Sequence, residues 1–410
     1  MNYPIKEIRS DFPILSEKIN NSPLIYLDNA ASSQKPKCVL QREIIYSSKE
    51  HSAVHRGIHT LSKNATKNME DIRSKIAKFI NAKSDSEIIF VKGTTEGINL
   101  VANTWGETFI KKGDNIVITQ MEHHANIVPW QLLSMRKKVD IKYIPLLPSG
   151  KLDICKIDDI INNNTRIFCI THVSNILGTC NLIEKIIKKI KNNYDIKVLI
   201  DGAQAIMHMK IDVQKIDCDF YVFSGHKIYG PSGIGVLYGK KKLLKKMPPW
   251  EGGGGMIKKV CLFSGTTFNE IPWRFEAGSP NISGIIGLGK SIEYVKKIGI
   301  KKIQKYEKKL IKYALLKIKN IPNIKIYSSE INTSIIPFNL KGCHSYDVGI
   351  LLDKYGVAIR TGHHCSMPIM NFFKVHSMCR ISVAMYSDES DIDNFIKSLL
   401  KVQKFLRRFN

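Results

Sequence analysis

The chain has 410 residues, enough for two or three domains, and its 43% hydrophobic and 24% charged residues are typical of a globular protein. No apolar run approaches the roughly 20 residues that a membrane-spanning helix requires, so we expect no membrane partner. The formal net charge is +26, but the lysines are spread among isoleucines and asparagines and form no recognition motif. We interpret the excess as a solvated basic surface and expect no specific nucleic-acid partner; a basic nucleic-acid-binding protein is the alternative from another functional class.

The N-terminal region predicts one short helix and one short strand. Residues 1–10 contain no apolar stretch of the kind that signal peptides have, so we expect no secretory leader. An amphipathic helix is expected over 6–12 and a strand over 24–28, followed by a turn of small residues near a pocket. Three histidines, among them His55, and one arginine then fall within residues 51–59. Their spacing matches no zinc pattern, and we interpret the stretch as an active-site loop.

A Gly-Thr-Thr sequence at 93–95 follows the predicted strand 88–91 and begins a predicted helix. Backbone N–H groups at a helix N-terminus, together with the helix dipole, form a cradle for an anion. The alternative is that Thr94 or Thr95 only caps the helix. No Gly-Lys-Ser/Thr sequence is present here, so a nucleotide-binding P-loop is not indicated.

Polar residues also follow the next two predicted strands. His123 comes after strand 116–119, where it could stack on a flat ring or serve as a hydrogen-bonded structural histidine, and Asn175 comes after strand 166–170. Strands that alternate with helical stretches predict an α/β fold with a largely parallel sheet and crossover helices. Ligands of such folds gather at the carboxyl ends of the strands, which is where these residues are expected.

Two buried strands end in the residues around which the chain is organised. The apolar run 198–200 ends in Asp201, and the run 220–223 leads to Lys227. Burial disfavours an ammonium group, so a lysine placed there can act as a neutral amine and form a Schiff base with an aldehyde. A carboxylate on the preceding strand can keep the ring nitrogen of pyridoxal phosphate (PLP) protonated. Taken alone, the pair could equally be a buried salt bridge.

A second informative stretch is Arg360-Thr-Gly-His-His-Cys365. A cysteine in a short loop with cationic or polar neighbours that favour the thiolate can attack sulfur as a nucleophile. The alternatives are a small buried hydrophobic residue and a His-His-Cys metal site. We favour catalysis and expect no metal. The nine cysteines are scattered and form no Cys-x-x-Cys pair, which indicates free thiols in a reduced cytoplasm.

Together these stretches resemble the class V aminotransferase family of fold type I PLP enzymes. The resemblance is carried by Asp201-Gly-Ala-Gln204, Ser224-Gly-His-Lys227 and Arg360-x-Gly-His-His-Cys365. Within the family, the chain is most similar to the SUF-type (group II) cysteine desulfurases, which also act on selenocysteine. The resemblance implies a large PLP-binding domain over 21–288, and a small domain made of the N-terminal helix within 1–20 and an α+β part over 289–410.

The resemblance also implies roles for individual residues. Lys227 is implied to bind PLP and move the α-proton, His123 to stack on the ring and move protons, and Cys365 to accept sulfur. The remaining implied cofactor contacts are Asp201, Gln204, Thr94, Thr95, Ser224, His226 and Ser279. The implied substrate contacts are Arg380, which binds the α-carboxylate, Asn175, Arg360 and His55. Two positions depart from the family pattern, because Ser279 stands where Thr is commoner and Ser366 stands where Ala is expected.

The implied reaction converts L-cysteine to L-alanine and leaves the sulfur as a persulfide on Cys365; L-selenocysteine would give alanine and selenide. The implied partners are a second copy of the chain in a homodimer, a SufE-like sulfur acceptor and iron–sulfur scaffold proteins. Residues 274–281 are expected to cross the dimer interface, and together with the loop around His55 they are expected to complete the site of the partner copy. An aminotransferase, a cysteine-sulfinate desulfinase and a dedicated selenocysteine lyase are the alternatives on the same fold.

Overall fold

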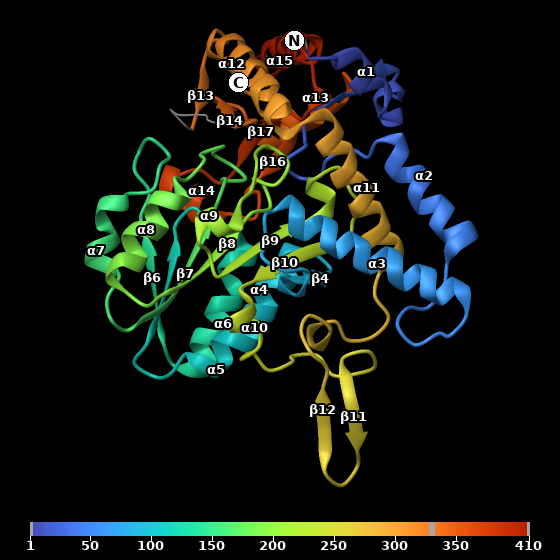
Figure 1. Ribbon diagram of the computed structural model, residues 1–410. Coiled ribbons are helices and arrows are strands. Elements are labelled where there is room, and N and C mark those ends of the chain that lie inside the picture. Colours follow the sequence, from blue (N-terminus) through green and yellow to red (C-terminus); the bar gives the residue numbers. More distant parts are fainter. Residues whose placement is uncertain (1–2, 328–332, 408–410) are drawn as a thin grey trace.

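A sheet of seven strands forms the centre of the larger lobe, in the order β4-β10-β9-β8-β7-β5-β6 (Figure 1). The computed structural model describes residues 3–327 and 333–407. The strands are β4 (Ile88–Val91), β5 (Asn115–Thr119), β6 (Asp140–Ile144), β7 (Thr165–Thr171), β8 (Lys197–Asp201), β9 (Phe220–Ser224) and β10 (Gly235–Gly239). Neighbouring strands from β6 to β9 run parallel, whereas β10 is antiparallel to both β9 and β4. The predicted α/β class with a largely parallel sheet is confirmed.

Helices cover both faces of this sheet, which explains why its strands are apolar along their whole length. Alternate strand residues face opposite sides, so Phe90 packs with one set of helices and Ile89 with the other. The first set is α3 (Thr60–Phe79), α8 (Ile183–Asn193), α9 (Val213–Ile216) and α11 (Ile282–Ile298); the second is α4 (Thr94–Val101), α6 (Val128–Lys137) and α10 (Lys241–Leu244). None of the helices in the described parts of the chain combines the length and apolar character that crossing a membrane requires.

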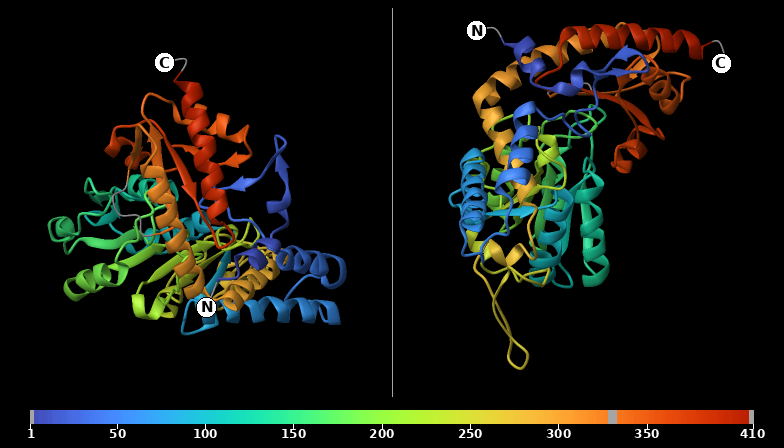
Figure 2. Two further views of the ribbon diagram at one scale, coloured as in Figure 1. Left: turned by 90° about the horizontal axis from the view of Figure 1, so that it is seen from above. Right: turned by 90° about the vertical axis from the view of Figure 1, so that its right-hand side faces the viewer.

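The smaller lobe is built on an antiparallel sheet of four strands with helices packed against it (Figure 2). Its strands are β13 (Ile324–Ile326), β14 (Ile335–Leu340), β17 (Met378–Ser382) and β16 (Arg360–Gly362). Its separate apolar core includes residues of α12 (Ile300–Lys319), α13 (Ser345–Asp353) and α15 (Glu389–Leu406). The nucleophile candidate Cys365 lies between β16 and the short helix α14 (Met367–Phe373).

The N-terminal segment packs with the smaller lobe. Helix α1 (Ile5–Ser10) is followed by the short strands β1 (Lys18–Ile19), β2 (Ser22–Pro23) and β3 (Ile25–Tyr26). Strand β3 pairs in parallel with β15 (Val357–Ala358), and the Ser382 N–H donates to the Leu27 carbonyl. Residues 25–28 thus hydrogen-bond to strands of the small lobe, although the predicted division assigns them to the large domain. The division at residues 20 and 288 itself stays a prediction.

A hairpin that the sequence did not reveal projects from the larger lobe (Figures 1 and 2). Its strands, β11 (Ile257–Cys261) and β12 (Gly265–Phe268), follow the glycine-rich loop that was expected at 248–256. At its tip, Leu262 is 94% and Phe263 is 99% exposed. The remaining helices are α2 (Lys37–Ile45), α5 (Glu107–Phe109) and α7 (Ile157–Ile160).

Candidate active site

A cavity of about 260 Å³ lies at the carboxyl ends of β8 and β9, where the small lobe meets the sheet. It is lined by most of the predicted site residues: Thr94, Thr95, His123, Asn175, Asp201, Gln204, Ser224, His226, Lys227, Arg360, Cys365 and Arg380. Two predicted residues lie elsewhere. Ser279 lines a separate pocket near the start of α11, and His55 lies on an exposed loop. Both were expected near the dimer interface, and that placement stays a prediction.

The carboxylate and the amine expected from the sequence face this cavity from adjacent strands. Asp201 ends β8, is 4% exposed and accepts the Ala203 N–H at 2.9 Å, and burial raises the pKa of its carboxyl to about 6. Lys227 follows β9 and donates from Nζ to the carbonyls of Ala30 and Ala31. Burial, helped by the positive charge of Arg380, lowers the pKa of Lys227 to about 7. Near neutral pH a large share of this lysine is therefore the nucleophilic neutral amine.

Hydroxyl groups gather where α4 begins. Thr94 is the first residue of the helix; its N–H donates to Ser224 Oγ at 2.9 Å, and the two hydroxyl oxygens lie 2.8 Å apart. A Cβ at Gly93 would come within 3.2 Å of Ser224 Oγ, so glycine keeps this corner open. The ring of His226 lies nearby on the cavity wall, and burial lowers its pKa to about 4. This wall combines a helix N-terminus with several donors, which suits a phosphate group.

The side chain of Gln204 tests whether PLP fits the cavity. Its Nε2 donates to the Ala30 carbonyl at 2.7 Å, whereas its buried Oε1 has no hydrogen-bond partner among the described residues. Buried polar atoms are nearly always paired, so an unpaired one lining a cavity indicates a missing ligand group. The cavity offers an amine for an aldehyde, a carboxylate for a ring nitrogen and hydroxyl donors for a phosphate. The residues present fit PLP.

His123 also lines the cavity and is held as a neutral ring. Its Nδ1 accepts the Ala125 N–H at 3.0 Å, and burial lowers its pKa to about 4. The neighbouring Glu122 is fully buried and accepts hydrogen bonds from the Thr171 N–H and from Nδ2 of Asn126. Glu122 therefore fixes the loop that carries His123 against the end of β7.

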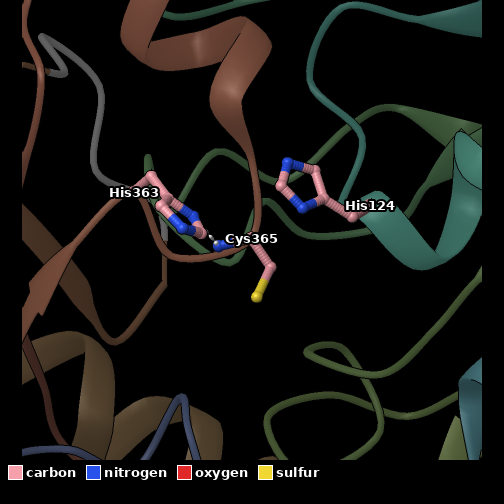
Figure 3. Close-up of side chains that lie close together, drawn as sticks. All are labelled: His124, His363 and Cys365. Atoms are coloured by element: carbon pink, nitrogen blue, oxygen red, sulfur yellow. Dashed lines mark hydrogen bonds between the residues drawn. The ribbon is translucent and has the colours of Figure 1, made fainter.

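The loop that carries Cys365 is held by the large lobe (Figure 3). His364 and Cys365 both have left-handed backbone conformations, with φ of 52° and 56°, which are costly for non-glycine residues. The His124 N–H donates to the Cys365 carbonyl at 2.7 Å, and the Met367 N–H donates to Nε2 of His124 at 3.1 Å. These contacts hold the loop in this conformation and leave the thiol of Cys365 exposed at the cavity.

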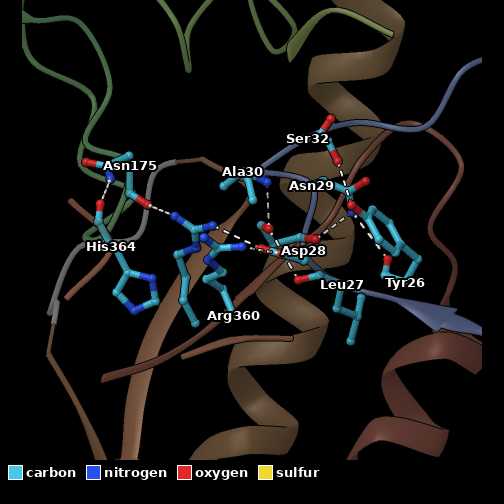
Figure 4. A network of polar contacts seen from close by, with 12 residues as sticks. Tyr26, Leu27, Asp28, Asn29, Ala30, Ser32, Asn175, Arg360 and His364 are labelled. Atoms are coloured by element: carbon cyan, nitrogen blue, oxygen red, sulfur yellow. Dashed lines mark hydrogen bonds and ion pairs between the residues drawn. The ribbon is translucent and has the colours of Figure 1, made fainter. Parts of the chain in front are cut away.

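Arg380 hydrogen-bonds to two residues of a polar network, Asp28 and Asn175, both of which are labelled in Figure 4. Its Nη1 donates to the Asn175 carbonyl at 2.8 Å and its Nη2 donates to Asp28 at 3.0 Å. Its buried Nε has no hydrogen-bond partner among the described residues. Arg360 approaches the same Asp28 carboxylate to 3.8 Å but is more exposed. Two guanidinium groups thus border the cavity, and a buried donor of Arg380 is free for an anion.

The amide of Asn175 contacts the loop that carries Cys365, at the residue before Cys365 and at the residue after it. Its Nδ2 donates to the His364 carbonyl at 2.8 Å, and its Oδ1 accepts from Ser366 Oγ at 3.1 Å. Asn175 was expected to contact the substrate and the cofactor ring; in the structure it lines the cavity while its amide holds the residues on either side of Cys365. The substrate contact stays a prediction.

Sequence reasoning missed three residues of this site: Asp28, Glu122 and His124. The sequence did place all three next to predicted features. Asp28 ends the predicted strand 24–28, and Glu122 and His124 flank His123. Their roles depend on partners that are distant in the sequence. Asp28 meets Arg380 only after the N-terminal segment has paired with the small-lobe sheet, and His124 meets the Cys365 loop only after the two lobes have packed together.

Comparison with known proteins agrees with this geometry. Residues 25–395 match the aminotransferase class-V family. A cysteine desulfurase of Serratia proteamaculans (strain 568) is 54% identical over 406 residues, which cover 99% of this chain and 100% of the relative. The chain belongs to the cysteine desulfurases of the class V aminotransferase family. A cysteine desulfurase of Pectobacterium carotovorum subsp. carotovorum (strain PC1) is 53% identical, with the same coverage.

Solved structures of cysteine desulfurases share the fold over nearly the whole chain. CsdA of Escherichia coli is 33% identical with a TM-score of 0.92, and the match covers 99% of this chain and 100% of that one. The apo enzyme of Thermococcus onnurineus NA1 is 35% identical with the same TM-score and covers 99% of both chains. The predicted family, the fold type I PLP architecture and the cofactor PLP are confirmed for this cysteine desulfurase family member.

Proposed function

We propose that the chain is a PLP-dependent cysteine desulfurase of the SUF type, which converts L-cysteine to L-alanine and carries the released sulfur as a persulfide on Cys365. The observation that carries this proposal is that Cys365, from the small lobe, and Lys227, from the large lobe, line one cavity. An aminotransferase would need no thiol at this position. PLP, when bound, supplies an electron sink for the electron pair left when the α-proton is removed.

Recognition of the substrate carboxylate is assigned to Arg380. Its buried Nε has no hydrogen-bond partner within residues 3–327 and 333–407, and its other nitrogens donate to Asn175 and Asp28. A guanidinium held in this way can bind a carboxylate with a charge-assisted hydrogen bond and a defined orientation. Arg360 and Asn175 are proposed as further contacts at the same end of the cavity.

Proton transfer is assigned to Lys227, with His123 as a second proton carrier. Lys227 would hold PLP through its amine and would move the α-proton of the substrate. A pKa of about 7 suits both tasks because the amine can accept and return a proton near neutral pH. Asp201 is proposed to hold a proton on the ring nitrogen. Thr94, Thr95, Ser224 and His226 are proposed for the phosphate, and Gln204 for the ring oxygen.

Sulfur transfer is assigned to Cys365. Its sulfur attacks the sulfur of the substrate, an S–S bond forms while the C–S bond of the substrate breaks, and the electron pair of that bond returns to the substrate carbon skeleton. The balanced products are L-alanine and one persulfide, so no external oxidant is needed. An exposed thiol on a loop suits delivery of this sulfur to a carrier, and we propose a SufE-like acceptor and, beyond it, iron–sulfur scaffold proteins.

The remaining parts of the proposal are a homodimer, a cytoplasmic location and activity on L-selenocysteine. Ser279 and His55 line no part of the cavity of their own chain, and the hairpin tip at Leu262 and Phe263 is exposed. These features support a second copy that completes the site. Sedimentation equilibrium tests this part, and a fully active monomer would contradict it.

The decisive experiment for the proposed function is mass spectrometry of the PLP-loaded protein after brief exposure to cysteine without reductant. We expect one added sulfur on the peptide that carries Cys365, together with one alanine released. The peptide that carries the buried Cys379 is the internal control and should stay unmodified. Added sulfur on Cys379, or alanine release without any persulfide, would overturn the assignment.

A further inference from the structure

We propose that His124, His363 and Cys365 form a binding site for a thiophilic divalent cation such as Zn²⁺, and that the bound ion blocks the sulfur of Cys365. The site is distinct from the cofactor contacts, because neither histidine is among the residues assigned to PLP. The inhibitory consequence rests on the proposed function, whereas binding of the ion does not.

The geometry brings three good metal ligands together. One ligand atom from each of the three residues lies within 4.8 Å of those of the other two. The rings of His124 and His363 are nearly parallel, with centroids 5.7 Å apart and an interplanar angle of 28°. In the view of Figure 3, Cys365 lies between the two rings and its sulfur is directed away from both. Cys365 is exposed and both rings are partly exposed, so an ion can reach the site from solvent.

The cluster is not the His-His-Cys sequence that the chain suggests. His364 is buried, its ring lies 2.9 Å from the Met378 carbonyl through Nε2, and it takes no part in the cluster. The left-handed backbone at positions 364 and 365 separates it from its neighbours. The second histidine comes instead from His124 of the large lobe, on the connection between β5 and α6. The site therefore exists only when the two lobes are packed together.

The chemistry of the three side chains selects the ion. Zn²⁺ binds imidazole nitrogen and thiolate sulfur at about 2.0–2.3 Å, so ligand atoms around a tetrahedral ion lie about 3.6 Å apart. Side chains within 4.8 Å of one another on a partly exposed surface need only small movements to reach that spacing. Three protein ligands leave one coordination position open for water or a substrate thiol. The hard cations Mg²⁺ and Ca²⁺ prefer oxygen ligands and should not bind.

Hydrogen bonds that the two histidine rings already make limit the affinity of this site for the ion. Nε2 of His124 accepts the Met367 N–H, and Nδ1 of His363 accepts the Cys365 N–H, both at 3.1 Å. A ring that binds the ion gives up this hydrogen bond, because its accepting nitrogen takes either the ion or, after a change of tautomer, a proton. The thiol proton passes to solvent without any redox change. We therefore expect reversible binding that responds to the free ion, not a permanently filled structural site.

The test is equilibrium dialysis of the PLP-loaded protein against Zn²⁺ in a reductant that contains no thiol, followed by metal analysis. We expect one ion per chain at this site, and an affinity that falls about tenfold or more in Cys365→Ala, His124→Ala and His363→Ala. Cys155→Ala and His376→Ala, which change an exposed thiol and an exposed imidazole outside the cluster, should bind like the unchanged protein. Dialysis against Mg²⁺ should leave no bound ion.

Co²⁺ provides a second readout, because a thiolate ligand gives Co²⁺ a charge-transfer band that should disappear in Cys365→Ala. Unchanged Zn²⁺ affinity in Cys365→Ala or His124→Ala would overturn the proposal. An equal loss of Zn²⁺ affinity in the control variants Cys155→Ala and His376→Ala would also overturn it. Inhibition is measured separately, as the rate of sulfide release with and without Zn²⁺. Zn²⁺ should lower this rate, and a chelator should restore it. Absence of desulfurase activity would refute the proposed function while the dialysis still decides the site.

Discussion

Asn175 donates a hydrogen bond of 2.8 Å from Nδ2 to the carbonyl of His364, the residue that precedes Cys365. The backbone carbonyl of the same asparagine accepts Nη1 of Arg380. The residue that holds the nucleophile loop thus also holds the arginine proposed to bind the substrate carboxylate. In the proposed mechanism, this arrangement links the position of the Cys365 sulfur to the position of the substrate.

Asn175→Ala should slow persulfide formation more than it weakens cysteine binding. Without the amide, the His364 carbonyl loses its donor and the strained backbone at 364 and 365 loses a restraint. A loop displaced by about 1 Å can cost roughly a hundredfold in rate, so we expect a decrease of about ten- to a hundredfold. The measurement is single-turnover mass spectrometry of the persulfide, compared with the cysteine-induced change in the cofactor spectrum.

Ser366→Ala is the matched control for this variant. It removes only the hydrogen bond from Ser366 Oγ to Asn175 Oδ1 and introduces the residue expected from the family pattern. We expect its rate of persulfide formation to stay within about fivefold of that of the unchanged enzyme, because one hydrogen bond contributes only about 1 kcal/mol. Equal rates in both variants would show that Asn175 does not position the loop.

Arg380→Lys should raise KM for cysteine by about ten- to a hundredfold. One ammonium group cannot contact Asn175 and Asp28 as the guanidinium does and also offer a free donor to the substrate. Loss of a charge-assisted hydrogen bond costs about 1.5–3 kcal/mol. Arg360→Lys is the comparison, and its effect should be smaller because Arg360 is 55% exposed and 3.8 Å from Asp28. A larger effect of Arg360→Lys in steady-state kinetics would reverse the assignment.

Covalent capture of PLP by the cofactor-free protein should accelerate as pH rises through about 7. The pKa of Lys227 is lowered to about 7 by burial, so its reactive neutral form is scarce at pH 6 and dominant at pH 8. For one titrating group with this pKa, the neutral fraction, and with it the rate of capture, increases about tenfold between these pH values. The measurement is the rate of borohydride-trapped PLP on the Lys227 peptide. Lys227→Ala should trap none there, and a midpoint near pH 10 would contradict the lowered pKa.

Arg73→Met should strongly destabilise the fold. Arg73 is 1% exposed, pairs with Glu70 and Glu276, and donates to the Ile88 carbonyl, so it ties α3 to β4 and to the segment before Ser279. Removing one partner of a buried pair costs about 3–5 kcal/mol, because the other charge stays buried without compensation. The measurement is the free energy of unfolding in urea.

The exposed pair of Lys67 and Asp71 on the same helix supplies the control for this prediction. Lys67→Met should change the free energy of unfolding by no more than about 0.5 kcal/mol, since exposed ion pairs contribute little. If Arg73→Met lowers the free energy of unfolding as little as the control does, the buried pair does not stabilise the contact of α3 with β4.

The sequence predicted the parts of the site that depend on local pattern. Asp201 and Lys227 follow apolar runs that can only be buried strands, so their place at the sheet edge could be expected. The contact of His124 with Cys365 could not, because it depends on how the small lobe packs against the sheet. The hairpin 257–268 also escaped prediction, since its exposed strands carry no apolar alternation.

Cys365→Ala separates the desulfurase from its alternatives on the same fold. The variant keeps the groups proposed to hold PLP and the substrate carboxylate, so it should still bind the cofactor and change its spectrum with cysteine. It lacks the thiol proposed to accept sulfur, and among the described residues no other cysteine lines the cavity. We therefore expect no persulfide and a loss of most cysteine turnover, by about a hundredfold or more, as for removal of a catalytic nucleophile. Selenocysteine turnover should fall much less, because selenium leaves more readily than sulfur and needs less help from the thiol.

Cys379→Ala is the matched control, since Cys379 is fully buried in the small-lobe sheet and outside the cavity. Undiminished cysteine turnover in Cys365→Ala, measured as alanine release, would exclude the thiol from the mechanism.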